Sequence, residues 1–343
     1  MTKTNISELG EFGLIDRLTN DINLFHKETI RGIGDDAAVI RHLDQNTLLT
    51  TDLLIEGVHF NIMYTPLKHL GYKAVAVNLS DIYAMNGNPT HVVVGIGISS
   101  KYTVESLEEL YLGMKLACEK FKIDFVGGDT TSSQSGLLIS VTAYGTANTE
   151  DITYRSGMQV NDLVCVSGDL GGAYAGLLIL EREKEAFKAN PSLQPDLAEY
   201  TYVIERQLKP EPRRDIIDML RENKIIPTSM IDVSDGLGSE LKHLCKLSAK
   251  GVVIYEQKLP IDIQTANVAH EFKIDPTTFA FNGGEDYELL FTIKQSDYPK
   301  LKDSSLISII GHVTDNPAQN DLITTSGNVV PITAQGWNPD QAQ

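Results

Sequence analysis

Aspartates that follow apolar segments are the residues in this sequence whose chemistry stands out. Taken singly, each fits an Asx turn or a helix cap. Taken together, they predict one convergent site, because strand ends meet at one edge of a sheet and converging carboxylates repel each other unless cations join them. The set, in which small or hydroxyl residues stand close by, is Asp36, Asp52, Asp81, Asp129, Asp232 and Asp235.

The donor type of this set favours a hard cation. Oxygen donors dominate, and there is neither a histidine cluster nor a Cys-x-x-Cys pair, so Mg²⁺ or Ca²⁺ fits better than zinc or copper. The calcium-loop pattern of an EF-hand is absent. Mg²⁺ usually completes its shell with phosphate oxygens, which points to a phosphate-bearing substrate and to phosphoryl transfer. The P-loop and the kinase-type glycine-rich loop are both missing.

Several other residues each have two interpretations. Gly168–Gly172 could present helix N–H groups to a phosphate, but close strand–helix packing is favoured. Arg155 is either a phosphate clamp or a solvated loop residue, and Arg213-Arg214 opens a helix where a partner anion would be favourable. His59 is by default a core histidine. Glu285-Asp286 follows a glycine pair and either binds substrate or forms a turn.

Composition excludes some classes of protein. The chain has 343 residues, 42% of them hydrophobic, and a formal net charge of -17, which argues against nucleic acid or an anionic membrane as partner. The three cysteines, Cys118, Cys165 and Cys245, are far apart, so we expect no disulfide and a cytoplasmic protein. Neither a signal peptide nor a membrane span is expected.

Strand and helix patterns alternate in both halves, which predicts an α/β or α+β fold. The sequence turns polar around 148–160, and we place the boundary there, with domains at 1–150 and 151–343. The apolar spacing predicts helices over 67–85 and 104–121. A further helix is expected over 173–180, followed by a charged surface connection over 183–195.

The motifs together resemble thiamine-monophosphate kinase, of the superfamily that includes aminoimidazole ribonucleotide synthetase, selenophosphate synthetase and a hydrogenase-maturation protein. The resemblance runs nearly end to end. The motifs that carry it are Gly34-Asp35-Asp36-Ala37-Ala38, Thr51-Asp52, Glu56-Gly57-Val58-His59-Phe60, Asn78-Leu79-Ser80-Asp81, Gly127-Gly128-Asp129-Thr130-Thr131, Arg155-Ser156-Gly157, Asp232-Val233-Ser234-Asp235-Gly236 and Gly283-Gly284-Glu285-Asp286-Tyr287.

The resemblance implies two α/β domains, a homodimer built through the N-terminal sheet, and transfer of the ATP γ-phosphoryl group to thiamine monophosphate. It also implies site residues. Several Mg²⁺ ions would be held by Asp36, Thr50, Thr51, Asp52, Asp81, Asp129, Asp232 and Asp235, of which Asp81, Asp129 and Asp235 are the catalytic candidates. ATP would contact Tyr111, Gly128, Asp129, Arg155 and Ser234, and the thiamine part would contact His59, Glu285 and Trp337.

Two motifs depart from the family pattern, at Ser132-Ser133 and at Asn86-Gly87. Both leave the aspartates in place and bear only on loop detail. Two alternative functions stay open. One is a sibling ATP-dependent enzyme such as an aminoimidazole ribonucleotide synthetase, and the other is a catalytically silent protein that binds Mg²⁺ and nucleotide.

Overall fold

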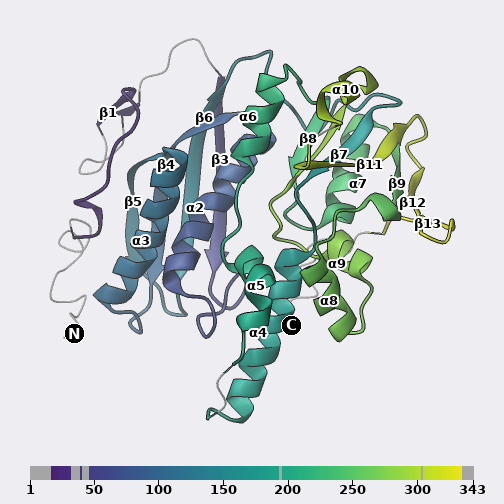
Figure 1. Ribbon diagram of the computed structural model, residues 1–343. Coiled ribbons are helices and arrows are strands. Elements are labelled where there is room, and N and C mark those ends of the chain that lie inside the picture. The colour runs from purple at the N-terminus through teal and green to yellow at the C-terminus, as the bar shows by residue number, and fades with distance from the viewer. Residues whose placement is uncertain (1–16, 32–38, 41–45, 193–194, 303, 334–343) are drawn as a thin grey trace. The chain divides into compact units, whose positions relative to one another are not determined.

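The computed structural model describes residues 17–31, 39–40, 46–192, 195–302 and 304–333. The chain divides into two compact units. The first comprises residues 1–82 and 87–150, and the second comprises residues 83–86 and 151–343. Each contains strands and helices, as the predicted fold class requires (Figure 1). No helix in the described ranges is long and apolar enough to cross a membrane.

The first unit contains a four-stranded sheet with the strand order β3-β6-β4-β5. The β4–β5 pair is parallel, and the β3–β6 and β4–β6 pairs are antiparallel. A separate short pair, β1–β2, is also antiparallel. The strands are β1 (Thr29–Arg31), β2 (Val39–Ile40), β3 (Asn46–Ile55), β4 (Asn88–Ile98), β5 (Asp124–Ser132) and β6 (Leu138–Ala147).

Two helices, α2 (Leu67–Ala84) and α3 (Val104–Phe121), cover one face of this sheet (Figure 1). They approach each other closely, because a Cβ on Gly71 would lie 1.9 Å from the carbonyl oxygen of Leu110 and one on Gly113 would meet that of Lys68 at the same distance. Residues 70–80 of α2 are all buried, as expected for a helix that is apolar or small on every side. Hydrogen bonds from Thr50 and Asp52 of β3 to side chains of α2 join the helix to this strand.

The second unit contains a seven-stranded sheet with the order β13-β12-β9-β11-β7-β10-β8. Its pairs are antiparallel except β9–β12, which is parallel. The strands are β7 (Leu163–Ser167), β8 (Ser229–Asp232), β9 (Gly251–Tyr255), β10 (Leu289–Ile293), β11 (Ile307–Thr314), β12 (Asn320–Ile323) and β13 (Val329–Pro331).

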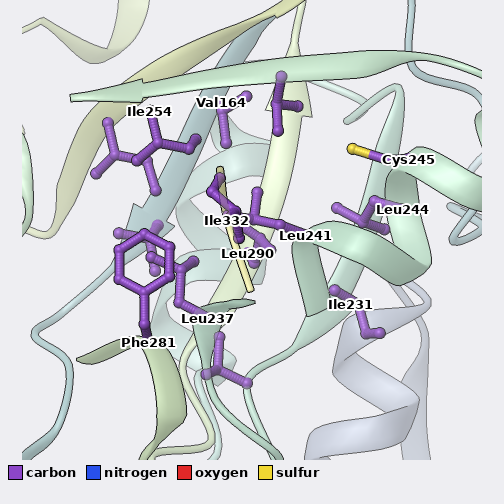
Figure 2. Close-up of a cluster of buried hydrophobic side chains, with 14 of the residues drawn as sticks. Val164, Ile231, Leu237, Leu241, Leu244, Cys245, Ile254, Phe281, Leu290 and Ile332 are labelled. Atoms are coloured by element: carbon purple, nitrogen blue, oxygen red, sulfur yellow. The ribbon is translucent and has the colours of Figure 1, made fainter. Parts of the chain in front are cut away.

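The helices of the second unit complete its fold. They are α4 (Gly172–Ala189), α5 (Thr201–Leu208), α6 (Arg214–Glu222), α7 (Leu237–Ser248), α8 (Ile263–Glu271), α9 (Pro276–Asn282) and α10 (Tyr298–Leu301), with 3-10 turns η1 (Ala198–Tyr200), η2 (Glu256–Lys258) and η3 (Gln295–Asp297). Figure 2 shows the main core, in which Leu237, Leu241 and Leu244 of α7 pack toward Val164 and Leu290 of the sheet.

The structure confirms some predicted elements and corrects one. Helix α3 spans 104–121 as predicted, and α2 ends one residue before the predicted position. The expected surface connection over 183–195 is wrong in its first part, because α4 continues to Ala189. Ion pairs spaced three residues apart, Glu181–Lys184 and Glu185–Lys188, stabilise this charged half of the helix.

All three cysteines are free and buried. Burial raises the pKa of each thiol well above its ordinary value. Their role is therefore to pack in the core.

Candidate functional site

In the first unit, α2 and β3 bring together part of the predicted aspartate set. The Thr50 hydroxyl donates to Asp81 Oδ2 over 2.6 Å, and the backbone N–H of Asp52 donates to Asn78 Oδ1 over 3.0 Å. Thr50 and Asp52 are two residues apart on β3, so their side chains share the face toward α2. Asn78 and Asp81 are three residues apart and share one face of that helix.

The two carboxylates of this cluster oppose each other electrostatically. Burial raises the pKa of Asp52 to about 6, and the negative charge of Asp81 acts in the same direction. Two partly buried carboxylates of like charge are costly unless a cation lies between them. With the Thr50 hydroxyl beside them, they form an all-oxygen donor set of the kind that Mg²⁺ takes.

These residues fit a divalent cation only as part of a larger shell. Within the described ranges, no three His, Cys, Asp or Glu side chains come close enough to form a metal cluster by themselves. Asp36, which the sequence adds to this set, lies outside the described residues, as does Trp337. The donor pair Asp52–Asp81 is therefore what the structure contributes to the metal prediction.

Asp129 does not join Asp52 within one chain. Asp52 pairs with Val141, which pairs with Val94, which in turn pairs with Gly128. This row crosses the whole sheet, so about three strand spacings, roughly 14 Å, separate β3 from β5. Asp129 is exposed on β5 at the opposite edge, too far to share a cation with Asp52.

The side chain of Thr51 also lies away from the Asp52–Asp81 pair. Its hydroxyl donates to the Val141 carbonyl and accepts a hydrogen bond from Thr142, both on β6. Thr51 is exposed, while its neighbours Thr50 and Asp52 are half-buried, as strand alternation requires.

The predicted nucleotide contacts of the first unit lie on β5 and α3. A Cβ on Gly128 would come within 1.8 Å of the Val94 carbonyl oxygen, so only glycine fits there. Tyr111 is buried and stacks on Phe125, with ring centroids 5.8 Å apart. Burial raises the pKa of Tyr111 to about 12, and its hydroxyl hydrogen-bonds to Thr130, next to Asp129.

His59 lies in the turn that follows β3. Its Nδ1 accepts a hydrogen bond from the backbone N–H of Ile55 over 3.0 Å, and the residue is exposed. The default interpretation as a core histidine is therefore wrong. A fixed, exposed imidazole is compatible with ligand binding.

In the second unit, the Asp232–Gly236 motif connects β8 to α7. Asp232 is buried at the end of the strand, and Asp235 is exposed just before the helix. Glu240, buried in the first turns of α7, accepts the backbone N–H of Asp235 at Oε1 over 2.9 Å. The Arg155 guanidinium lies near enough to attract the Glu240 carboxylate. Arg155, Asp235 and Glu240 thus form one group, of which the sequence analysis did not single out Glu240.

Glu240 should make stability depend on pH. Burial raises its pKa to about 7 from 4.5, and the charge of Asp235 adds to the shift. The native state then holds a proton that the unfolded chain has already lost, so stability falls as pH rises across this window. We expect the Tm of Glu240→Gln minus that of wild type to increase between pH 5 and pH 8 in thermal unfolding. A difference that stays constant with pH contradicts this assignment.

The segment Glu285–Glu288 is held by contacts on both sides. The N–H of Glu285 donates to the Ser234 carbonyl over 2.8 Å, so this predicted substrate residue adjoins a predicted ATP residue. Glu288 is buried and accepts hydrogen bonds from Ser167, Arg206 and Arg213.

Asp286 settles the two interpretations of Gly168–Gly172. The Asp286 carboxylate is buried and accepts the N–H groups of Gly171 and Ala173 at the start of α4, over 2.6 and 3.1 Å. A carboxylate at a helix N-terminus is favourable there. These two N–H groups are bonded to protein, which supports the packing interpretation over the phosphate one.

The two arginines for which the sequence suggested a partner anion form ion pairs with carboxylates of the same chain. Arg213 pairs with Glu288 and Asp215, and Arg214 lies 3.4 Å from Asp218. Nearby negative charge keeps the pKa of Arg213 above its ordinary value, against the opposing effect of burial. The Arg213–Glu288 pair joins residues that are 75 positions apart, so no local pattern in the sequence indicates it.

Comparison with known proteins adds to this geometry. Residues 34–147 match the family described as AIR synthase related protein, N-terminal domain. A thiamine-monophosphate kinase from Aquifex aeolicus is 36% identical over 84% of this chain and 87% of its own length. One from Bacillus subtilis is 33% identical over 96% of this chain and 99% of its own length. The chain belongs to the thiamine-monophosphate kinase family.

Solved structures agree with membership of the thiamine-monophosphate kinase family. A structure described as AaThiL complexed with AMPPCP and TMP is 32% identical, covers 98% of this chain and 99% of its own, and has a TM-score of 0.74. The hydrogenase maturation protein HypE in complex with ATP is 17% identical over 95% of this chain and 96% of its own, with a TM-score of 0.72. The second likeness shows the fold alone.

Proposed function

We propose that the protein transfers the γ-phosphoryl group of ATP to the phosphate of thiamine monophosphate, forming ADP and thiamine diphosphate. The observation that carries the proposal is the Asp52–Asp81 pair with Thr50, on the elements that the family motifs occupy. Membership of the family and the ligands named for the related structure support the choice of substrates.

The phosphate groups of ATP and of thiamine monophosphate repel each other, yet they must come together in this reaction. The carboxylates would reduce this repulsion indirectly, by holding Mg²⁺. Asp52, Asp81 and Thr50, together with Asp36, would hold Mg²⁺, and the remaining predicted ligands are Thr51, Asp129, Asp232 and Asp235. Mg²⁺ held by these residues would supply the positive charge that offsets the phosphate charges during transfer. The acceptor oxygen belongs to a phosphate monoester whose second pKa is about 6, so it is mostly ionised at neutral pH. A side chain acting as general base is therefore not required for direct in-line transfer.

The remaining predicted site residues bind and orient the substrates. Arg155 carries the positive charge that suits an ATP phosphate, and Ser234, Gly128 and Tyr111 complete the nucleotide contacts. His59, Glu285 and Trp337 would hold the thiamine part, where a carboxylate and an aromatic ring both favour a heteroaromatic cation. In this assignment residues 1–150 bind ATP and metal and form the dimer, and residues 151–343 add metal, nucleotide and substrate contacts.

The homodimer is supported by the outer face of the four-stranded sheet. The side chains of Leu49 and Leu53 on β3 are 67% and 44% exposed, and they flank Thr51 on the face away from α2. Large apolar side chains exposed on the same face of a strand are consistent with a surface that another chain covers. A second copy that packs its own sheet here would form an isologous interface.

Such a dimer also accounts for the position of Asp129. A single sheet keeps β3 and β5 at opposite edges. If two sheets pack face to face around a two-fold axis, the β3 edge of one protomer can meet the β5 edge of its partner. We therefore assign Asp129 and Gly128 to the site formed by the partner's Asp52 and Asp81.

The test is an assay of ADP release by the purified chain with ATP, Mg²⁺ and thiamine monophosphate. We expect equal amounts of ADP and thiamine diphosphate with this acceptor, and none with free thiamine or an aminoimidazole-pathway substrate. Turnover with another acceptor alone would move the protein to a sibling enzyme. ATP binding without ADP formation on any acceptor would make it a nucleotide-binding protein without catalysis.

A further inference from the structure

Helix α5 places two side chains against the Glu285–Glu288 segment. Arg206 lies 2.9 Å from Glu288 Oε1 and 3.6 Å from Asp286 Oδ1. The next residue, Gln207, donates from Nε2 to Glu285 Oε2 over 2.7 Å. Gln207 is only 6% exposed although its side chain is polar. A buried amide directed at a predicted substrate residue requires an explanation beyond packing.

The backbone on both sides of this contact is already fixed without Gln207. A Cβ on Gly176 of α4 would lie 2.0 Å from the Val203 carbonyl oxygen and 3.0 Å from Gln207 Cβ, so α5 rests directly on α4. Glu285 has φ +70° and donates its N–H to Ser234. The direction of the Glu285 carboxylate is set by its side-chain contacts, and the hydrogen bond from Gln207 is one of them.

The chemistry of the donor matters as much as its position. An amide donates a hydrogen bond to a carboxylate without adding a positive charge. The arginines on the same stretch are directed instead to Asp286 and Glu288. The Gln207 amide thus places a neutral donor beside the Glu285 carboxylate, which suits the binding of a cationic ligand.

We propose that Gln207 is a positioning residue for acceptor binding, acting through Glu285 to present its carboxylate to the cationic part of the acceptor. The inference rests on the proposed function and on Glu285 binding the acceptor. It makes Gln207 a determinant of acceptor affinity and gives it no part in phosphoryl transfer itself.

The test replaces Gln207 with methionine, which has similar length and no donor. A lost hydrogen bond to a charged group corresponds to about a tenfold weaker affinity. We expect the Kd for thiamine monophosphate, measured by calorimetry without ATP, and its KM to rise by about tenfold. The kcat and the KM for ATP should stay within about twofold of wild type, because Glu285 is assigned to the thiamine part and not to the transferred phosphate.

A double-mutant cycle separates positioning from general packing. In a Glu285→Gln background, Gln207→Met should weaken acceptor binding no further, because its partner carboxylate is already gone. The matched control is Gln264→Met, which changes an exposed glutamine of α8. It should leave the Kd and the KM for thiamine monophosphate unchanged. If Gln207→Met does not fold, Gln207→Leu also removes the donor without adding a charge, and it carries the same expectation.

Two results would overturn the inference. One is an unchanged affinity for thiamine monophosphate in the folded Gln207 variants, and the other is an equal loss of that affinity with and without the Glu285 carboxylate. In either case, activity of the wild-type protein in the ADP assay would still support the proposed function. Wild-type protein that neither binds nor phosphorylates thiamine monophosphate would overturn both.

Discussion

Replacing Asp81 with asparagine is expected to lower kcat by about a hundredfold to a thousandfold, the scale for removing one preorganised electrostatic contact in an active site. The Thr50 hydroxyl can still donate to the amide oxygen of the substituted side chain, so the local hydrogen bond persists. What is lost is the charge that would bind Mg²⁺. The measurement is kcat from the coupled ADP assay at saturating Mg²⁺, and near-normal turnover would remove Asp81 from the site.

The same variant should be more stable than wild type in metal-free buffer. Burial and the Asp81 charge raise the pKa of Asp52 to about 6. Because this folded-state pKa lies above the unfolded value, the wild-type chain loses stability as pH rises from about 4 through 6. Removing the Asp81 charge relieves part of that loss. We expect a higher Tm for Asp81→Asn in EDTA at pH 8, and a smaller gain at pH 5.

Added Mg²⁺ should reverse the order of stability. A ligand that binds only the folded state raises Tm by mass action, and the variant has lost part of the binding site. Asp315→Asn is the matched control, since it removes an exposed carboxylate paired with Lys250, remote in sequence from the aspartate set. A variant less stable than wild type in EDTA at pH 8 would show that Asp81 is a structural residue.

The aspartate pair could be predicted from the sequence because its signals are local. The apolar segments before Asp52 and Asp81 indicate a strand and a helix that are near neighbours in the chain, although β3 continues past Asp52 to Ile55. The periodicity of residues 104–121 is equally local and gave the helix with its correct ends.

Strand order and buried networks could not be predicted in this way. The sequence marks Asp129 as strongly as Asp52, yet the order β3-β6-β4-β5 places them at opposite edges. That order depends on which hydrophobic faces pack together, and no single motif encodes it. Gln207 and Glu285 are likewise 78 positions apart, and a glutamine within a charged helix gives no sign of its buried partner. The helix predicted over 173–180 is too short, because the charged residues that follow it are typical of a surface connection. Those residues instead continue α4 and stabilise it through ion pairs within the helix itself.

Mixed dimers of Asp81→Asn and Asp129→Asn chains are expected to recover activity that neither homodimer has. If each site joins Asp81 of one protomer to the partner's Asp129, one site of the mixed dimer carries both substitutions and the other carries neither. About half of the wild-type kcat per dimer should return, because one of two equivalent sites is intact. The two chains would carry different affinity tags, and the dimer would be purified through both before the ADP assay.

The control for this experiment pairs Asp81→Asn with Asp52→Asn. Both residues lie in one cluster of one chain, as the Asp52–Asp81 interaction shows, so every site in that mixed dimer lacks one of them and no activity should return. Dissociation and reassortment of the tagged chains cannot imitate recovery, because each homodimer is inactive. If the Asp81→Asn and Asp129→Asn mixture stays as inactive as this control, each site is built within a single chain, and Asp129 at the far edge of the sheet serves another purpose.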